Sequence, residues 1–243
     1  MGGEVRCVVM SSLPPEKVDL PPQFETTAIT QKKWNWLTWA GIILVLIVVL
    51  VLSAPMVLRS QRMADSTQTV CNARQIGLAL FEFKTEYGCF PDETTIAQVK
   101  ANNTTDSHLG TKTSNDFFRQ MIVARIAQSE TMFYAKIKGI QKPDNVTTAG
   151  QALKKGECGF TYLSGLNTSG NLSRPLVVTP LIPGTDRFDP KPFQGKAVIL
   201  KMDNSVSILP IRKDGHVWIN GMNFLDPSHP LWGGKPPVII WPE

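Results

Sequence analysis

Residues 34–58 read WNWLTWAGIILVLIVVLVLSAPMVL, and none of these residues is charged. At ~1.5 Å per residue, a helix of this length reaches ~37 Å, which exceeds the ~30 Å hydrocarbon core of a bilayer. Trp34, Trp36 and Trp39 cluster at its amino end, where indole rings favour the headgroup layer of a membrane. A cleaved signal peptide fits less well, because the preceding segment is long and typical signal cores have about 7–15 apolar residues. The stretch therefore predicts one transmembrane helix.

A second helical pattern follows the apolar stretch. Gly88 is a natural helix stop in the left-handed conformation, and residues 59–65 hold no Gly or other turn signal between the two patterns. We therefore predict one helix over residues 34–87, kinked at Pro55 near the outer membrane face. Its second half carries an apolar stripe with steps of three or four, which we expect to pack on a globular domain: Val70, Ala73, Ile76, Leu80, Phe83 and Tyr87.

The charged residues are spread unevenly along the chain. Residues 1–33 carry four basic and four acidic side chains, so the net charge of +5 falls after residue 58. Without a Lys/Arg cluster, this mild excess does not indicate a nucleic-acid partner. The positive-inside rule comes close to a tie, because basic residues flank both ends of the span. Cysteine placement favours residues 1–33 in the cytoplasm and the domain of residues 59–226 outside it.

The cysteines after the span suggest a disulfide. Cys89 and Cys158 each lie beside a glycine at the edge of an expected element, where a disulfide fits an oxidising compartment. The alternative is that they are unpaired, small apolar residues. No CxxC and no Cys/His metal-ligand spacing occurs, so thiol redox chemistry and zinc binding are not expected.

The remaining chain predicts an α+β domain. We expect an exposed loop over residues 97–114 and a helix over residues 115–138, which opens with a capping box of Thr113 and Asp116. Short β-branched runs then predict strands at GFTYL, RPLVVTP, KAVILKM, SVSILPI and HVWIN, the last three as an antiparallel meander with turns at Asp203-Asn204 and Asp214-Gly215. Two helices are expected to cover this sheet, and the Pro- and Gly-rich tail of residues 227–243 to run irregularly over the surface.

Two motifs resemble a known family. CNARQIGLALFEFKTEYGCFPD (71–92) resembles the end of the long helix in prepilin-like proteins of planctomycete and verrucomicrobial bacteria, and KMDNSVSILPIRKDGHV (201–217) resembles their late strands. The resemblance implies the architecture of type IV pilins and type II secretion pseudopilins, in which a long helix lies half in the membrane and half on a small antiparallel sheet. It also implies a bacterial inner-membrane protein with a periplasmic domain and protein neighbours in an envelope assembly.

The chain departs from that family at its amino end. Pilin precursors have a Gly-Phe junction that a peptidase cleaves, and a Glu in the first apolar turn that pairs with a neighbouring subunit. Here the span opens QKKWNWLTWAGIILVLI, without either feature. A buried charge of this kind is costly unless it is paired. The resemblance therefore implies the fold more strongly than it implies processing or self-association into a filament.

Enzyme and metal chemistry are weakly indicated. His108, His216 and His229 are scattered, and no HExxH, GxSxG, P-loop or GxGxxG motif occurs, so we do not expect an enzyme or an organic cofactor. The loop GTDRFDPKPFQGK, with Asp186 and Asp189, and the Asp203-Asn204 turn offer oxygen ligands for calcium, but their spacing matches no EF-hand. Solvated turn carboxylates are the alternative.

The sequence leaves three candidate functions open. The leading hypothesis is a membrane-anchored structural or scaffold protein of a secretion or pilus-like system, with lipid and protein partners. The second is a stand-alone anchored domain that holds a partner through its sheet face or its tail. The third is an envelope hydrolase, which predicts a pocket that brings His216 near an acid or a nucleophile.

Overall fold

The computed structural model describes the chain from residue 36 onward, except for residues 104–108, 149 and 167–169. Trp34 and the segment 1–33 lie outside the described residues. The chain divides into two units, Met1–Val49 and Leu50–Glu243.

The protein is α+β, with one long apolar helix near its amino end and an antiparallel sheet. Its helices are α1 (Trp36–Tyr87), α2 (Thr95–Asn103) and α3 (Ser114–Val123), with the 3-10 turns η1 (Glu130–Phe133) and η2 (Pro230–Trp232). Its strands are β1 (Thr161–Ser164), β2 (Pro175–Thr179), β3 (Lys196–Lys201), β4 (Val206–Pro210), β5 (Trp218–Ile219), β6 (Met222–Asn223) and β7 (Val238–Ile240).

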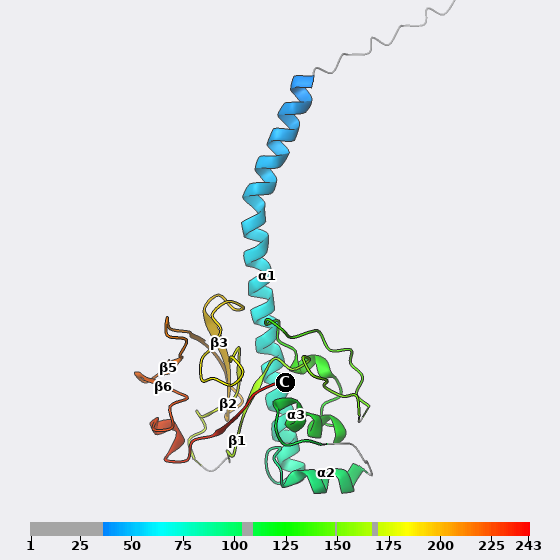
Figure 1. Cartoon of the computed structure of the whole chain (residues 1–243), viewed down its shortest axis with the longest axis vertical. Helices are drawn as coiled ribbons and strands as arrows, with labels where there is room; N and C mark the ends of the chain where they lie inside the picture. Colours follow the sequence, from blue (N-terminus) through cyan, green and yellow to red (C-terminus); the bar gives the residue numbers. More distant parts are fainter. Residues whose placement is uncertain (1–35, 104–108, 149, 167–169) are drawn as a thin grey trace, which may run out of the picture. The chain divides into compact units, whose positions relative to one another are not determined.

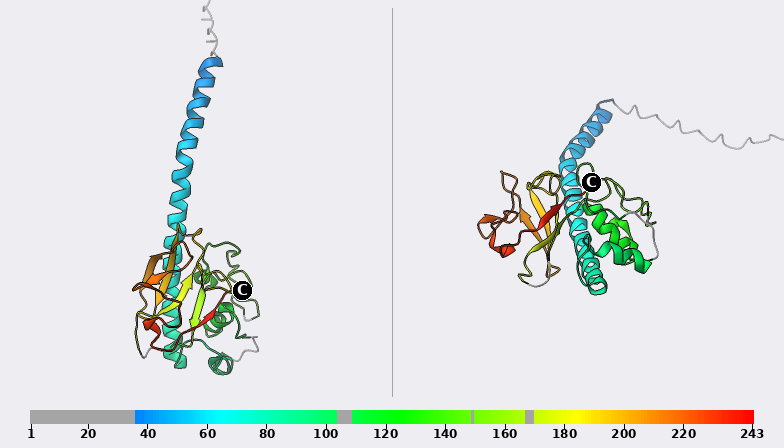
Figure 2. Two further views of the ribbon diagram at one scale, coloured as in Figure 1. Left: turned by 60° about the vertical axis from the view of Figure 1, so that its left-hand side comes forward. Right: turned by 60° about the horizontal axis from the view of Figure 1, so that its bottom comes forward.

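Helix α1 ends where the sequence predicts. Gly88 has φ of 84°, and its N–H donates to the carbonyl of Lys84 at 2.8 Å. Figures 1 and 2 show that, within the second unit, α1 lies between the sheet on one side and α2 and α3 on the other. Both sides of this part of the helix therefore face other elements.

The sheet has the order β4-β3-β2-β1-β7, and every pairing in it is antiparallel. The turn between β3 and β4 lies at Asp203-Asn204 as predicted, and Asn204 adopts the left-handed φ of 61°. The predicted meander continues past β4 through the turn at Asp214-Gly215, because Ile211 forms an antiparallel bridge with Val217 and the N–H of Arg212 donates to the carbonyl of His216. HVWIN does not form a full third strand, since Trp218–Ile219 pairs with Met222–Asn223 in a separate hairpin.

Both faces of the central strands β1, β2 and β3 are buried, and their residues alternate between two apolar clusters. On β3, Val198 and Leu200 pack with residues of α1 and α3, whereas Ala197 and Ile199 pack in the second cluster. This second cluster is completed by residues that follow the main strands, namely Val217, Phe224, Leu225, Leu231 and Trp232. Period-two alternation places successive side chains on opposite faces, which explains why the strands read as nearly continuous apolar runs.

The prediction of an irregular surface tail is therefore wrong. Leu231 and Trp232 are buried, and β7 pairs with β1 as an edge of the sheet. The prolines and glycines of the tail do form turns, since Gly233 and Gly234 have positive φ. Leu231 and Trp232 nevertheless bury against the sheet, and burial of apolar area outweighs local irregularity there.

Two helix predictions also need correction. The expected loop of residues 97–114 contains most of α2, and the expected helix of residues 115–138 stops at Val123. The N–H groups of Ile126 and Ala127 both turn back to the carbonyl of Met121, and Arg125 has φ of 61°, so the chain reverses there. Phe133 and Ile137 continue the apolar spacing only because the same core receives them from η1 and the loop after it.

Gly159 sets a close approach of two backbone segments. A Cβ at this position would lie 2.8 Å from the amide nitrogen and 3.0 Å from the carbonyl oxygen of Ala135. Gly159→Ala is therefore expected to lower the free energy of unfolding by about 2–3 kcal/mol, the cost of overpacking against backbone. Urea unfolding of the full chain in detergent measures this. Gly150→Ala is the matched control, because its Cβ meets nothing within 4 Å, and an equal loss in both variants would contradict the explanation.

Candidate functional site

Helix α1 carries the candidate membrane anchor. It is the one helix among the described residues whose length and apolar composition would allow it to cross a membrane. Trp36, Trp39 and the apolar residues that follow them are exposed, for example Leu46 at 56% and Leu52 at 70%. No acidic residue lies in the first turn of α1. Pro55 falls inside the helix, and the kink expected there stays a prediction.

The stripe in the second half of α1 lies against the domain. Ala73, Ile76, Leu80, Phe83 and Tyr87 are buried, and Val70 is partly buried against the same core. One polar residue beside this stripe was not singled out from the sequence.

That residue is Asn72, whose side-chain amide donates to the carbonyls of Thr131 and Tyr134 at 3.0 and 2.8 Å. A buried amide that bonds two carbonyls fixes the segment around η1 against α1.

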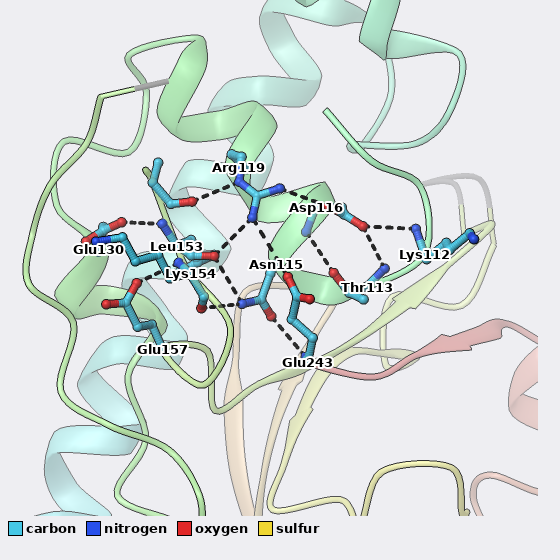
Figure 3. Close-up of polar contacts among 11 residues, drawn as sticks. Lys112, Thr113, Asn115, Asp116, Arg119, Glu130, Leu153, Lys154, Glu157 and Glu243 are labelled. Atoms are coloured by element: carbon cyan, nitrogen blue, oxygen red, sulfur yellow. Dashed lines mark hydrogen bonds and ion pairs between the residues drawn. The ribbon is translucent and has the colours of Figure 1, made fainter. Parts of the chain in front are cut away.

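A polar network joins the start of α3 to the end of the chain (Figure 3). The Asn115 amide donates to the carbonyls of Leu153 and Lys154, and its oxygen accepts the N–H of Glu243 at 3.3 Å. Asn115 is fully buried, so these bonds replace those it would make with water.

Arg119 completes this network. Its guanidinium donates to the carbonyls of Ala152 and Leu153, and it pairs with Asp116 at 2.9 Å. The side chain is only 13% exposed, so the ion pair is shielded from water. Through Arg119 and Asn115, α3 holds the segment 152–154 and the carboxyl end of the chain together. This network positions backbone segments, because the polar groups of Asn115 and Arg119 bond to main-chain or ion-pair partners.

Asp116 forms the predicted capping box with Thr113 and also accepts the N–H of Lys112 at 3.1 Å. Burial opposes ionisation of Asp116, but the N–H bonds from Lys112 and Thr113 and the charge of Arg119 outweigh it and lower its pKa. A depressed folded-state pKa contributes stability above the unfolded pKa of about 3.9, and this contribution is lost as the pH falls further.

Asp116→Asn is therefore expected to cost about 1–2 kcal/mol of unfolding free energy at pH 7. The difference from the unmodified chain should shrink as the pH falls below about 4. Urea unfolding between pH 3 and pH 7 measures both effects, with the exposed Glu93→Gln as control. A difference that stays constant across this range would show that the ionised carboxylate is not what stabilises the cap.

The structure brings three carboxylates together at a place the sequence did not indicate. Glu130, Asp144 and Glu157 each offer an oxygen, and these atoms lie within 4.8 Å of one another. Burial, followed by the charges of Glu157 and Asp144, raises the pKa of Glu130. Asp144 is exposed and bonds to Lys154 at 2.7 Å, which lowers its pKa. Neither periodicity nor local spacing links these residues, because they come from three separate segments.

The predicted disulfide between Cys89 and Cys158 is wrong. The three described cysteines, Cys71 among them, are free. The Cys158 thiol is fully buried and donates to the carbonyl of Phe160, and burial raises its pKa to about 12. The Cys89 thiol contacts Asp92, and burial together with that carboxylate raises its pKa as well. Both sulfurs thus have other partners and little thiolate character, which disfavours oxidation.

The late loop proposed for calcium is not assembled as a metal-ligand group among the described residues. Asp189 accepts the N–H of Lys191, and Asp203 accepts the N–H of Ser205, so both act as ordinary turn residues. The Asn204 oxygen is buried and has no hydrogen-bond partner, and Asp186 lies against His216. Turn formation therefore uses the oxygens of Asp189 and Asp203 that the sequence offered to calcium.

The histidines occupy three different settings. His108 lies outside the described residues. The ring of His229 accepts the N–H of Leu231 and so caps the start of η2. His216 lies 3.2 Å from Asp186 and 3.6 Å from Asp214. In the described part of the chain, this ring pairs with two carboxylates, and no hydroxyl or thiol bonds to it. A hydrolase would also need a nucleophile there.

Comparison with protein-family models, with curated proteins and with solved structures found no match for this chain. Its function is therefore inferred from its own residues.

Proposed function

We propose that this chain is a membrane-anchored, pseudopilin-like structural or scaffold protein of a secretion or pilus-like envelope system. Its apolar segment would sit in the bacterial inner membrane, and its domain on the periplasmic side would act through contacts with other proteins. The proposal is supported by the combination of a long apolar helix with an α+β domain whose sheet is antiparallel.

One observation carries the proposal most directly. Helix α1 is exposed and apolar over its first half, and over its second half it presents buried residues such as Ile76, Leu80 and Phe83 to the domain core. A helix that only anchored the chain would need no buried second half. A helix that belonged only to a soluble core would not expose an unbroken apolar run such as Trp39 to Leu52.

The absence of an acidic residue in the first turn of α1 refines the proposal. Lateral contacts between spans would have to arise from packing of apolar side chains rather than from a lipid-buried ion pair. Such contacts are weaker, so we expect a scaffold that associates with other subunits and not a filament formed by this chain alone.

Site-specific photo-crosslinking in native membranes tests this role. A crosslinker placed at Ile43, Leu46 or Leu50 should capture one or a few defined protein neighbours, whereas one at Leu172, exposed on the domain, reports background. Deletion of the gene should also change the set of secreted or surface proteins. A chain that crosslinks to nothing from any of the three span positions, and whose deletion leaves secretion unchanged, would refute the proposal.

A second candidate is a stand-alone anchored binding domain, and one feature favours it. A cavity of about 320 Å³ is lined mainly by apolar residues, among them Ile140, Leu181, Ile182 and Pro242. Cavities of this size and character commonly hold small ligands or a partner's side chain. Ile182→Asp in the full chain should abolish retention of a partner in detergent pull-downs if this cavity binds it. Unchanged retention would remove the candidate.

A further inference from the structure

The three clustered carboxylates come from segments that are distant in sequence. Glu130 opens η1, Asp144 lies in the loop that follows, and Glu157 lies shortly before β1. Figure 3 shows Glu130 and Glu157 close together beside the backbone of Leu153 and Lys154. Glu130 and Glu157 are 0% and 7% exposed, so two of the three carboxylates are removed from bulk water.

Main-chain hydrogen bonds hold each carboxylate in place. One oxygen of Glu130 accepts the N–H of Leu153, and one oxygen of Glu157 accepts the N–H of Lys154 at 2.6 Å. Asp144 accepts the N–H of Val146 at 3.0 Å. Backbone donors thus preorganise the site, although Asp144 itself is exposed to solvent.

The second oxygen of Glu130 stands apart. Glu130 Oε2 is buried and has no hydrogen-bond partner. A buried, unpaired carboxylate oxygen is costly, and native structures usually give such an atom a proton or a cation. This orphaned atom is an observation independent of the clustering, and it indicates a missing positive partner.

The local charge balance points the same way. Three ionised carboxylates face one ammonium, that of Lys154, which contacts only Asp144. An excess of two negative charges remains when all are ionised, which one divalent cation neutralises. Ligand oxygens on opposite sides of a calcium ion lie up to about 4.6–5.2 Å apart, given Ca–O distances of about 2.3–2.6 Å. The mutual separations of up to 4.8 Å in this cluster fit that limit.

We propose that Glu130, Asp144 and Glu157 form a calcium site that fastens the segment between η1 and β1. Calcium is favoured over magnesium because it accepts irregular oxygen geometry and exchanges its water readily, whereas magnesium demands near-octahedral geometry and retains several waters. Two buried carboxylates leave little room for a hydrated magnesium ion. The site lies apart from Asp186, Asp189 and Asp203 and does not depend on the scaffold role.

Bound calcium would join three backbone segments at one point. The N–H of Glu130 and the hydroxyl of Ser129 bond to the Asn145 side chain, so η1 already contacts the loop next to Asp144. The ion adds a link from both to Glu157. Because the ion binds the folded chain only, it should raise the stability of the domain in proportion to its concentration.

Calcium titration of the full chain in detergent, after removal of metal with EDTA, tests the site. Calorimetry with CaCl₂ alone should show one ion bound per chain, and the unfolding temperature should rise by about 5 °C at 100 times the dissociation constant. MgCl₂ at the same concentrations should give a much smaller rise. No calcium-dependent rise, or an equal rise with magnesium, would overturn the proposal.

Four variants assign the effect to these residues. Asp144→Asn and Glu157→Gln should each weaken calcium binding about tenfold or more, while Asp189→Asn, in the late loop, should leave it unchanged. Lys154→Gln should tighten binding because it removes the competing ammonium, whereas a purely structural ion pair would predict only a loss of stability. Asp144→Asn keeps an oxygen for the Val146 N–H, so it should fold even if Glu157→Gln does not. Binding that survives in Asp144→Asn, or is lost in Asp189→Asn, would overturn the assignment.

Discussion

Trp232→Ala is expected to lower the free energy of unfolding by about 3–5 kcal/mol, the usual cost of removing a buried large aromatic side chain. Trp232 is 2% exposed and lies in the cluster on the second face of the sheet, together with residues such as Val178 and Ile199. Its indole N–H also donates to the carbonyl of Phe224 at 2.8 Å. The loss therefore combines a cavity with an unpaired carbonyl. Thermal and urea unfolding of the full chain in detergent measure it, with an expected fall in melting temperature of about 10 °C.

Two further substitutions separate these contributions. Trp232→Phe keeps most of the ring and removes the N–H, so it should cost about 1–2 kcal/mol. Trp218→Ala is the matched control, because Trp218 is 40% exposed and stacks on Arg212 at 3.9 Å, a contact worth about 0.5–1 kcal/mol at an exposed site. If Trp232→Ala cost no more than Trp218→Ala, the tail would not be part of the core.

The long helix and the local turns could be predicted because each depends on neighbours in sequence. The stripe from Val70 to Tyr87 and the stop at Gly88 follow from helical period and from the freedom of glycine at positive φ. The capping box of Thr113 and Asp116 and the turn at Asn204 are equally local. In such cases a few residues determine the backbone, and the rest of the fold only has to accommodate it.

The second face of the sheet could not be predicted, because the residues that cover it are distant in sequence and have no period. Leu231 and Trp232 lie among prolines and glycines, a composition typical of surface loops. Strand β7 has three residues and lies beside β1, about 75 positions earlier in the chain. The end of α3 was missed for a related reason, since apolar spacing continued through Phe133 and Ile137 although the helix did not.

The polar groups of the domain also divide into local contacts, which could be predicted, and long-range contacts, which could not. Asn115 and Arg119 bond to carbonyls more than 30 residues away, and Glu130 meets Glu157 only after the chain has folded. A single sequence carries no signal for such pairs. The carboxylates that did look suggestive, Asp189 and Asp203, are used by their own turns. Local spacing therefore identified these turns, which was the alternative that the sequence offered to calcium binding.

A double substitution in the apolar segment of α1, Leu46→Arg with Leu50→Arg, is expected to abolish stable membrane association. Each arginine near the centre of a spanning helix costs about 2.5–3.5 kcal/mol of insertion free energy, so the pair costs about 5–7 kcal/mol. Both positions lie near the centre of the apolar segment, so neither arginine is within easy reach of an interface by snorkelling. Alkaline carbonate extraction measures the result: the unmodified chain should stay in the membrane pellet, and the variant should move largely to the supernatant.

The control makes two Leu→Arg substitutions as well, but at positions outside the apolar segment. Leu78→Arg with Leu172→Arg introduces the same two charges at exposed positions of the domain, where Leu78 is 61% and Leu172 is 49% exposed. This pair should leave the chain in the pellet, because a surface leucine gains little from burial and an exposed arginine costs little. If the span variant also stayed in the pellet, α1 would not be the anchor. If both variants were released, the domain itself would bind the membrane, and the exposed apolar half of α1 would then require a protein partner to cover it.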